Sequence, residues 1–280
     1  MSQAREIEFH GQPAIDLKSP DGARAVVLLH GGQLVSWIPA GGEEQLYLSE
    51  TSRFGEGQSV RGGVPVIFPQ FAARGTLPRH GLLRTRAWKR EEALVRGRHA
   101  QAVLRFAADE ATKRDWPHAF EAEITVSLAG RQIDIELAIV NTGDTPFEFT
   151  AALHTYLRTA DVLKLQLEGL QGVRYEDSLG GEWQQQWGDV LTVVTEVDRI
   201  YQDAARTLTL RELGRRLQIE ASGFPDVVVW NPGAEKTAQL KDMLPEDWRH
   251  MLCVEAALVH QPALLAPGAE WSGMQTLVAG

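Results

Sequence analysis

The chain has 280 residues, 44% of them hydrophobic, with 28 Lys and Arg against 37 Asp and Glu and a formal net charge of −9. The length suits one large domain or two small ones with a substantial core, and the acidic balance disfavours nucleic-acid partners, which need a broad basic face. One cysteine, Cys253, excludes an intrachain disulfide and a cysteine-rich metal site.

The first residues, MSQAREIEFHG, lack the apolar core of a signal peptide, and the chain contains no apolar run long enough to span a bilayer. We therefore expect a cytoplasmic protein without a membrane partner. The eight histidines show none of the spacings typical of a metal site, so no metal is expected.

The predicted elements are mostly strands. Residues 23–42 contain two apolar segments around a Gly-Gly pair, and residues 120–143 alternate on either side of an Ala-Gly-Arg turn, which predicts a hairpin. Further strands are expected within residues 147–159, 162–170, 190–196, 206–213, 215–222, 226–232 and 250–259. Short helical turns are expected within residues 109–116 and 246–251. Many short strands predict an all-β antiparallel sandwich or barrel, in a single domain over residues 1–280.

Residues 61–90 form a basic window in this acidic chain. Their sequence, RGGVPVIFPQFAARGTLPRHGLLRTRAWKR, holds seven Lys or Arg and no Asp or Glu. One interpretation is a solvated basic edge. The other is a pocket for a small anion, because the arginine guanidinium presents a fork of donors that matches phosphate or carboxylate. Gly62 and Gly63 would then let a ligand approach the backbone closely.

Two more residues are candidates for acid–base chemistry. His154, in AALHTYLR, follows an apolar strand, where a lone histidine is more often a hydrogen-bonded structural residue. Glu255, in MLCVEAALV, is expensive to bury unless something pairs with it, although alternation could also turn it outward on the face of Cys253 and Ala257. An imidazole and a carboxylate would make a plausible acid–base pair. The residues alone do not show that the two meet.

Six motifs occur in a characteristic order: VRGGVPVIFPQF, LPRHGLLR, LHTYLR, VDRIYQD, VVVWNP and CVEAALV. In this order the chain resembles the hexose-6-phosphate mutarotases, or glucose-6-phosphate 1-epimerases, of the aldose 1-epimerase superfamily, from GGQLVSW to LAPGAEW. The resemblance implies a large twisted antiparallel β-sandwich with few short helices, the supersandwich of galactose mutarotase-like proteins. It also implies a sugar phosphate as the small-molecule partner and no cofactor. A monomer is favoured.

The implied reaction interconverts the α and β anomers of an aldohexose 6-phosphate, with glucose 6-phosphate first among them, by acid–base opening and closure of the ring. The motif match implies that Glu255 is the base and His154 the acid. By the same match, the residues around the sugar and its phosphate are His80, Asp198, Arg61, Arg79 and Arg84.

Three departures from the family pattern concern sugar preference more than reaction type. Ala256 follows Glu255 where Pro is usual, Leu82-Leu83 replaces Phe-Ala, and Arg79 stands where Gln or Ser is usual. Two other functions stay open. One is a non-catalytic sugar-phosphate sensor on the same fold, and the other is a carbohydrate lyase or glycosidase.

Overall fold

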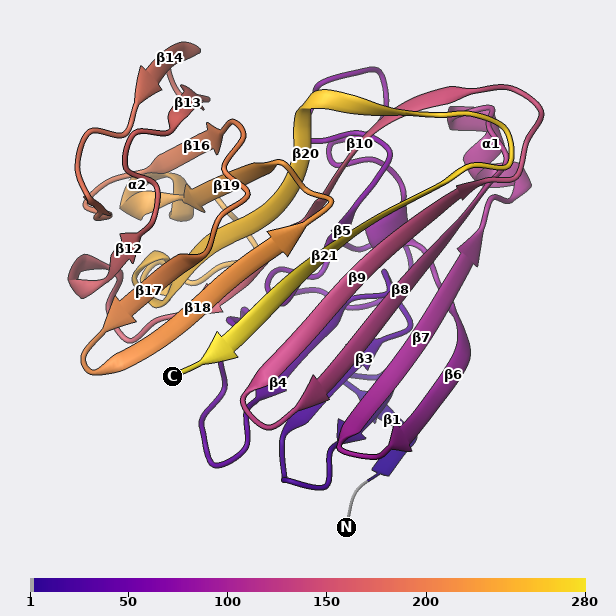
Figure 1. Ribbon diagram of the computed structural model, residues 1–280, viewed down its shortest axis with the longest axis horizontal. Helices are drawn as coiled ribbons and strands as arrows, with labels where there is room; N and C mark the ends of the chain where they lie inside the picture. Colours follow the sequence, from indigo (N-terminus) through magenta and orange to yellow (C-terminus); the bar gives the residue numbers. More distant parts are fainter. Residues whose placement is uncertain (1–2) are drawn as a thin grey trace.

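The computed structural model describes residues 3–280, which fold into three antiparallel sheets (Figure 1). The first has the order β1 (Gln3–Phe9), β2 (Gln12–Lys18), β3 (Arg24–Leu28), β4 (Leu34–Ile38). The second has eight strands in the order β14 (Glu182–Gln185), β13 (Arg174–Asp177), β16 (Val197–Tyr201), β19 (Asp226–Asn231), β20 (Met251–Leu265), β10 (Phe147–Leu153), β5 (Val66–Ile67), with β11 (Tyr156–Arg158) also paired to β20.

The third sheet has nine strands, in the order β15 (Val190–Leu191), β12 (Gln166–Glu168), β17 (Leu208–Glu212), β18 (Arg215–Ser222), β21 (Glu270–Ala279), β9 (Gln132–Asn141), β8 (Phe120–Ala129), β7 (His99–Ala107), β6 (Lys89–Arg96). Strands β1, β2 and β3 of the first sheet contact β6, β7 and β8, so the first sheet lies against one end of the third (Figure 1). The predicted all-β sandwich is confirmed.

The helices are short: α1 (Glu110–Asp115), α2 (Gly233–Thr237) and the 3₁₀ turns η1 (Leu83–Thr85), η2 (Val162–Lys164) and η3 (Asp247–His250). The turns predicted at 109–116 and 246–251 are confirmed as α1 and η3. A capping box starts α1, in which the Asp109 side chain accepts the Thr112 N–H and the Thr112 side chain accepts the Asp109 N–H. None of the helices within residues 3–280 is long and apolar enough to cross a membrane.

Alternation explains the hairpin of β8 and β9. Every second residue of these strands is buried, and the predicted turn falls at Gly130 and Arg131. The segment 162–170 departs from its prediction as a strand, because the Asp161 side chain accepts the Leu163 N–H and starts η2 before the short strand β12.

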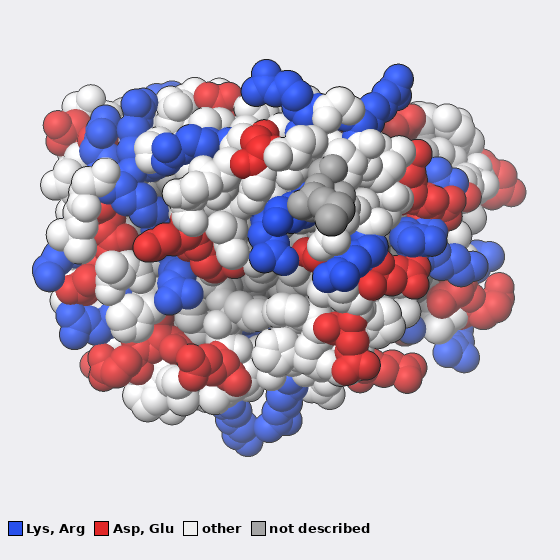
Figure 2. Space-filling view, turned by 90° about the horizontal axis from the view of Figure 1, so that it is seen from below, with Lys and Arg blue, Asp and Glu red and all other residues white. Residues whose placement is uncertain are grey.

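Basic and acidic side chains are interspersed over the face of the molecule seen in Figure 2.

The first nine residues of strand β20, 251–259, are buried on both faces. Val254 and Ala256 pack into the main core, which also includes residues of the nine-stranded sheet. Cys253 and Ala257 face the opposite side, as alternation predicted, and each belongs to a smaller apolar cluster. Ala256 pairs with β10 on one side and β19 on the other, so the strand continues regularly past Glu255.

Gly62 and Gly63 bring strands of the protein itself close together. Both have positive φ, +118° and +60°. A Cβ on Gly63 would lie 2.2 Å from the Leu34 carbonyl oxygen, and one on Gly62 would lie 2.4 Å from the Tyr47 carbonyl oxygen. The close approach that the sequence suggested for a ligand is therefore taken by neighbouring backbone.

Replacing Gly63 by alanine should lower the free energy of unfolding by about 2–4 kcal/mol, because the new methyl group adds a backbone clash to left-handed strain. Gly41→Ala is the matched control: Gly41 has φ +67°, but no atom lies within 4 Å of the place that an added methyl group would take, so conformation alone should cost about 1 kcal/mol. Urea unfolding of both variants measures the difference. Equal losses would contradict the packing role of Gly63.

Candidate functional site

One cavity of about 590 Å³ is lined by all seven residues that the motif match implied. They are Arg61, Arg79, His80, Arg84, His154, Asp198 and Glu255. The cavity lies on the face of the eight-stranded sheet that carries Glu255, away from the main core. Of the seven cations in the basic window, four line this cavity, and the other three, Arg86, Lys89 and Arg90, do not.

Glu255 and His154 meet at this cavity. Glu255 is 1% exposed within β20, and His154 is 7% exposed just after the neighbouring strand β10. The His154 Nδ1 atom lies 3.3 Å from Glu255 Oε1, and the imidazole stacks on the Tyr156 ring at 4.8 Å. The alternative in which alternation turns the Glu255 side chain out to solvent is excluded.

The pKa values of the two groups move in opposite directions. Burial, reinforced by the Asp198 carboxylate, raises the pKa of Glu255 well above its usual value. Burial also lowers the pKa of His154 well below its usual value, and the nearby His80, Arg61 and Arg84 add to this effect. The pair is therefore best described as holding one proton between two groups over a wide pH range. Such a pair can accept one proton while giving up another.

His80 is a neutral hydrogen-bond donor at the same cavity. It adopts φ +66°, and its Nδ1 accepts the Ala72 N–H at 3.3 Å, which leaves the proton of the neutral ring on Nε2. Burial lowers the pKa of His80 to about 3, with further contributions from Arg84, Arg79 and Arg61. Asp198 lies on β16, and burial raises its pKa as well.

Five cationic side chains line the cavity, and three of them are neutralised by acidic partners. The pairs are Arg61 with Asp242 at 3.0 Å, Arg74 with Glu176 at 2.5 Å, and Lys236 with Glu196. The fold thus provides a carboxylate for each of these three cations before any ligand is bound.

Arg79 and Arg84 have no acidic partner among residues 3–280. The Arg84 guanidinium donates to the Arg79 carbonyl oxygen at 2.8 Å. Burial lowers the pKa of Arg84, and the charges of Arg61 and Arg79 lower it further. Like charges gathered in a half-buried place favour binding of an anion.

The structure adds residues that the sequence did not single out. Tyr156 accepts a hydrogen bond from Arg61 at 3.0 Å and stacks on His154, while the ring of Trp230 lies 6.0 Å from the Arg61 guanidinium carbon. Both aromatic residues lie inside two of the six family motifs, LHTYLR and VVVWNP, so their place in the chain was a usable signal. Lys236, on α2, lies outside all the motifs and had no local signal.

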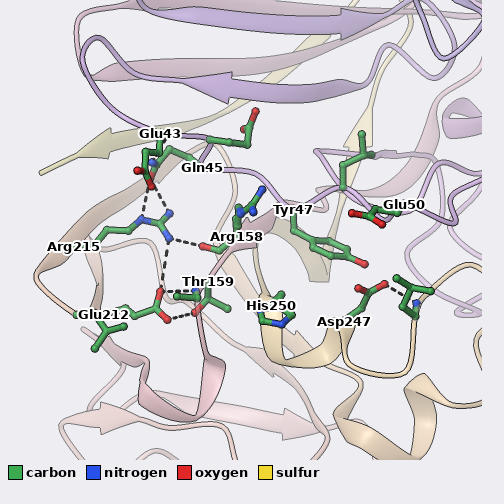
Figure 3. A pocket seen from close by; sticks show the side chains of 15 residues that line it. Glu43, Gln45, Tyr47, Glu50, Arg158, Thr159, Glu212, Arg215, Asp247 and His250 are labelled. Carbon is green, nitrogen blue, oxygen red and sulfur yellow. Dashed lines mark hydrogen bonds and ion pairs between the residues drawn. The ribbon is translucent and has the colours of Figure 1, made fainter.

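A second cavity of about 560 Å³ contains none of the seven residues (Figure 3). Its central charges are satisfied within the fold: Arg215 donates to Gln45 and to the Arg158 carbonyl oxygen, and Glu212 accepts from Thr159. The Tyr47 ring of this cavity lies 6.3 Å from the Tyr156 ring of the first.

No group of three or more His, Cys, Asp or Glu side chains that could hold a metal occurs within residues 3–280.

These sheets and the polar cavity over β20 define a galactose mutarotase-like β-sandwich. Residues 13–277 match the family model of aldose 1-epimerase. A protein of Cenchrus ciliaris with the name "Putative glucose-6-phosphate 1-epimerase" is 34% identical over 94% of this chain and 87% of its own length. A protein of Escherichia coli K12 with the same name is 32% identical over 84% of this chain and 79% of its own length. The chain belongs to the aldose 1-epimerase family.

Solved structures agree with this fold. The crystal structure of a protein from Salmonella typhimurium described as a "putative mutarotase" superposes with a TM-score of 0.91, at 26% identity, over 100% of this chain and 96% of that one. A protein from Synechocystis sp. PCC 6803 superposes with a TM-score of 0.79 over 100% and 96% of the two chains, and at 21% identity it supports the fold alone.

We expect the His80 imidazole to stay neutral from pH 8 down to about pH 5, because burial and three arginines oppose a further positive charge. Histidine NMR shifts recorded across this range should not change for His80. In Arg84→Ala the pKa of His80 should rise, since one positive charge is removed. A wild-type His80 that titrates near the usual value of about 6.5 would contradict this electrostatic description.

Proposed function

We propose that this protein interconverts the α and β anomers of glucose 6-phosphate. The observation that carries the proposal is the 3.3 Å contact of Glu255 with His154 in a cavity that also holds two unpaired arginines. The first feature suits proton transfer at an anomeric carbon, and the second suits a phosphate group. The names of the relatives from Cenchrus ciliaris and Escherichia coli point to the same substrate.

In this mechanism Glu255 and His154 act on the two oxygens bonded to C1. The Glu255 carboxylate removes the proton of the C1 hydroxyl while the His154 imidazolium gives a proton to the ring oxygen, so the bond from C1 to the ring oxygen breaks and an aldehyde forms. Because both oxygens are attached to one carbon, the acid and the base must reach the same end of the sugar, and these two side chains line the same cavity. No cofactor is needed.

Rotation about the C1–C2 bond then presents the other face of the aldehyde. Ring closure reverses the roles: His154 takes the proton from the C5 hydroxyl, and protonated Glu255 returns a proton to the former carbonyl oxygen. At the end of the cycle Glu255 and His154 carry the same protons as at its start. Burial assists the two transfers of ring opening, since it makes the Glu255 carboxylate a stronger base and the His154 imidazolium a stronger acid, and it disfavours the reverse transfers of ring closure.

His80 and Asp198 are proposed to orient the sugar. The neutral His80 ring can donate from Nε2, and the Asp198 carboxylate can accept from hydroxyl groups. The phosphate is assigned to Arg79 and Arg84, whose charges no carboxylate within residues 3–280 neutralises. Arg61 is assigned a supporting role, because its guanidinium already donates to Asp242 and Tyr156.

Glu255→Gln and His154→Ala should each lower turnover by about 10²- to 10⁴-fold, the usual contribution of one general acid or base. Freshly dissolved α-glucose 6-phosphate, followed by optical rotation or one-dimensional NMR, gives the rate of anomer exchange above the spontaneous one. Circular dichroism must show that each variant is folded. Turnover near that of the wild type in either variant would remove that residue from the mechanism, and binding without acceleration by the wild type would favour a sensor.

Arg84→Ala should reduce the efficiency on glucose 6-phosphate about 10- to 150-fold relative to glucose, as expected for the loss of a charge-assisted contact to a partly buried anion. Arg79→Ala should have a smaller effect of roughly 2- to 5-fold, because Arg79 is exposed. Arg84→Lys should restore only part of the loss, since an ammonium lacks the planar fork.

Lys89→Ala is the control for this comparison, because Lys89 lies exposed on β6 and outside the cavity. For Lys89→Ala, the ratio of kcat/KM for glucose 6-phosphate to kcat/KM for glucose should equal that of the wild type. If Arg84→Ala also leaves this ratio unchanged, the arginines do not bind phosphate, even if the protein proves to be a mutarotase for neutral sugars.

A further inference from the structure

The segment from Phe71 to His80 forms a loop at the edge of the cavity. Its base is fixed, since the Phe71 N–H donates to Thr150 Oγ1 at 2.7 Å and the His80 N–H donates to the Ala72 carbonyl oxygen at 2.9 Å. Residues 73–76 at its tip are exposed. There the Arg74 guanidinium donates to Glu176 on β13 at 2.5 Å, and both of these side chains line the cavity.

Glu176 also contacts His260, on the side away from Arg74. Its Oε2 atom lies 3.1 Å from His260 Nε2, while its Oε1 accepts from Arg74. The other ring nitrogen of His260, Nδ1, lies 3.6 Å from Asp226 Oδ1, which is too long for a hydrogen bond but close enough for attraction between charges. Asp226 is anchored in turn by the backbone N–H groups of Val259 and His260, each at 2.9 Å.

The surroundings of His260 favour its protonated form. The carboxylates of Asp226 and Glu176 face its ring, which packs against Trp183 on β14, and the Arg174 guanidinium lies over the same Trp183 ring at 5.2 Å from its centroid. Burial opposes the charge, but the two carboxylates together raise the pKa of His260. Arg74 and His260 outweigh burial and lower the pKa of Glu176. The result is a row of alternating charges from Asp226 to Arg74.

We propose that His260 is a positioning residue for the substrate cavity: by holding Glu176 against Arg74, it fixes the loop whose far end carries Arg79 and His80. His260 itself does not line the cavity. The consequence for catalysis rests on the proposed function, in which Arg79 and His80 contact the sugar phosphate. The placement of the loop does not rest on it, so the two can be tested separately.

Hydrogen exchange of the backbone amides of residues 72–77 and 79, without substrate, tests the placement of the loop. His260→Gln keeps a donor but removes the charge, and Glu176→Gln keeps the shape of the carboxylate but removes the charge that pairs with Arg74. Each should speed exchange in the loop about 3- to 10-fold, as expected for loss of a partly exposed charge-assisted contact. Arg105→Ala, which breaks the remote pair of Arg105 with Glu123 on β7 and β8, should leave the loop unchanged. Unchanged exchange in His260→Gln would overturn the proposal, whatever the result for Glu176→Gln.

Kinetics test the consequence. His260→Gln should raise KM for glucose 6-phosphate about 3- to 10-fold with kcat within about twofold, because the loop orders a binding group rather than the proton-transfer pair. The double variant with Arg74→Ala should be no worse than Arg74→Ala alone, since both changes act through Glu176. If the effects of His260→Gln and Arg74→Ala on KM multiply in the double variant, the two residues do not act through Glu176, and the proposal is contradicted. If the wild type accelerates the interconversion of anomers of neither glucose 6-phosphate nor glucose, the proposed function fails. Hydrogen exchange of the loop amides still decides the role of His260.

Discussion

The contact between Glu255 and His154 is the constraint around which the site is built. An ionised carboxylate isolated in a protein interior is strongly unfavourable, by several kcal/mol, unless a partner or a proton compensates it. Here burial raises the pKa of Glu255 and so favours its protonated form, with an imidazole 3.3 Å away. The strand that carries Glu255 is held by two neighbouring strands and by core packing on its opposite face. This support keeps a costly group in place, and the same burial raises the proton affinity of Glu255 and lowers that of His154.

The rest of the cavity is arranged around this nearly neutral pair. The chain has an excess of acidic residues, and three of them, Asp242, Glu176 and Glu196, neutralise Arg61, Arg74 and Lys236 at the cavity. Arg79 and Arg84 form no direct ion pair with a carboxylate within the described fold. A dianionic ligand would satisfy these two residues, and in a cavity walled by protein its attraction is stronger than on an open surface. An acidic protein can therefore hold an anion without a broad basic face.

Much of the fold could be predicted from local pattern. Alternation located β8 and β9, and the box of Asp109 and Thr112 explains why a helix interrupts the strands. The chemistry of His154 and Glu255 could also be named from the sequence, but not their meeting, because it depends on the register in which Leu153 pairs with Ala256. For the same reason the prediction for the Gly62–Gly63 pair was wrong: only the folded chain shows that its own carbonyl oxygens occupy the space that a ligand was expected to use.

Of the three departures from the family pattern, only Arg79 reaches the cavity. Leu82 and Leu83 are 3% and 0% exposed and lie outside the cavity lining, and Ala256 is a core residue of a regular strand. Two of the departures therefore concern packing, where residues of suitable size can replace one another if the volume is conserved. Arg79 brings a charge to the cavity beside Arg84, which has no acidic partner within residues 3–280. Under the proposed function, a substrate preference would thus arise from electrostatics at the end of the cavity that holds Arg79 and Arg84, while Glu255, His154 and their supporting strands stay the same.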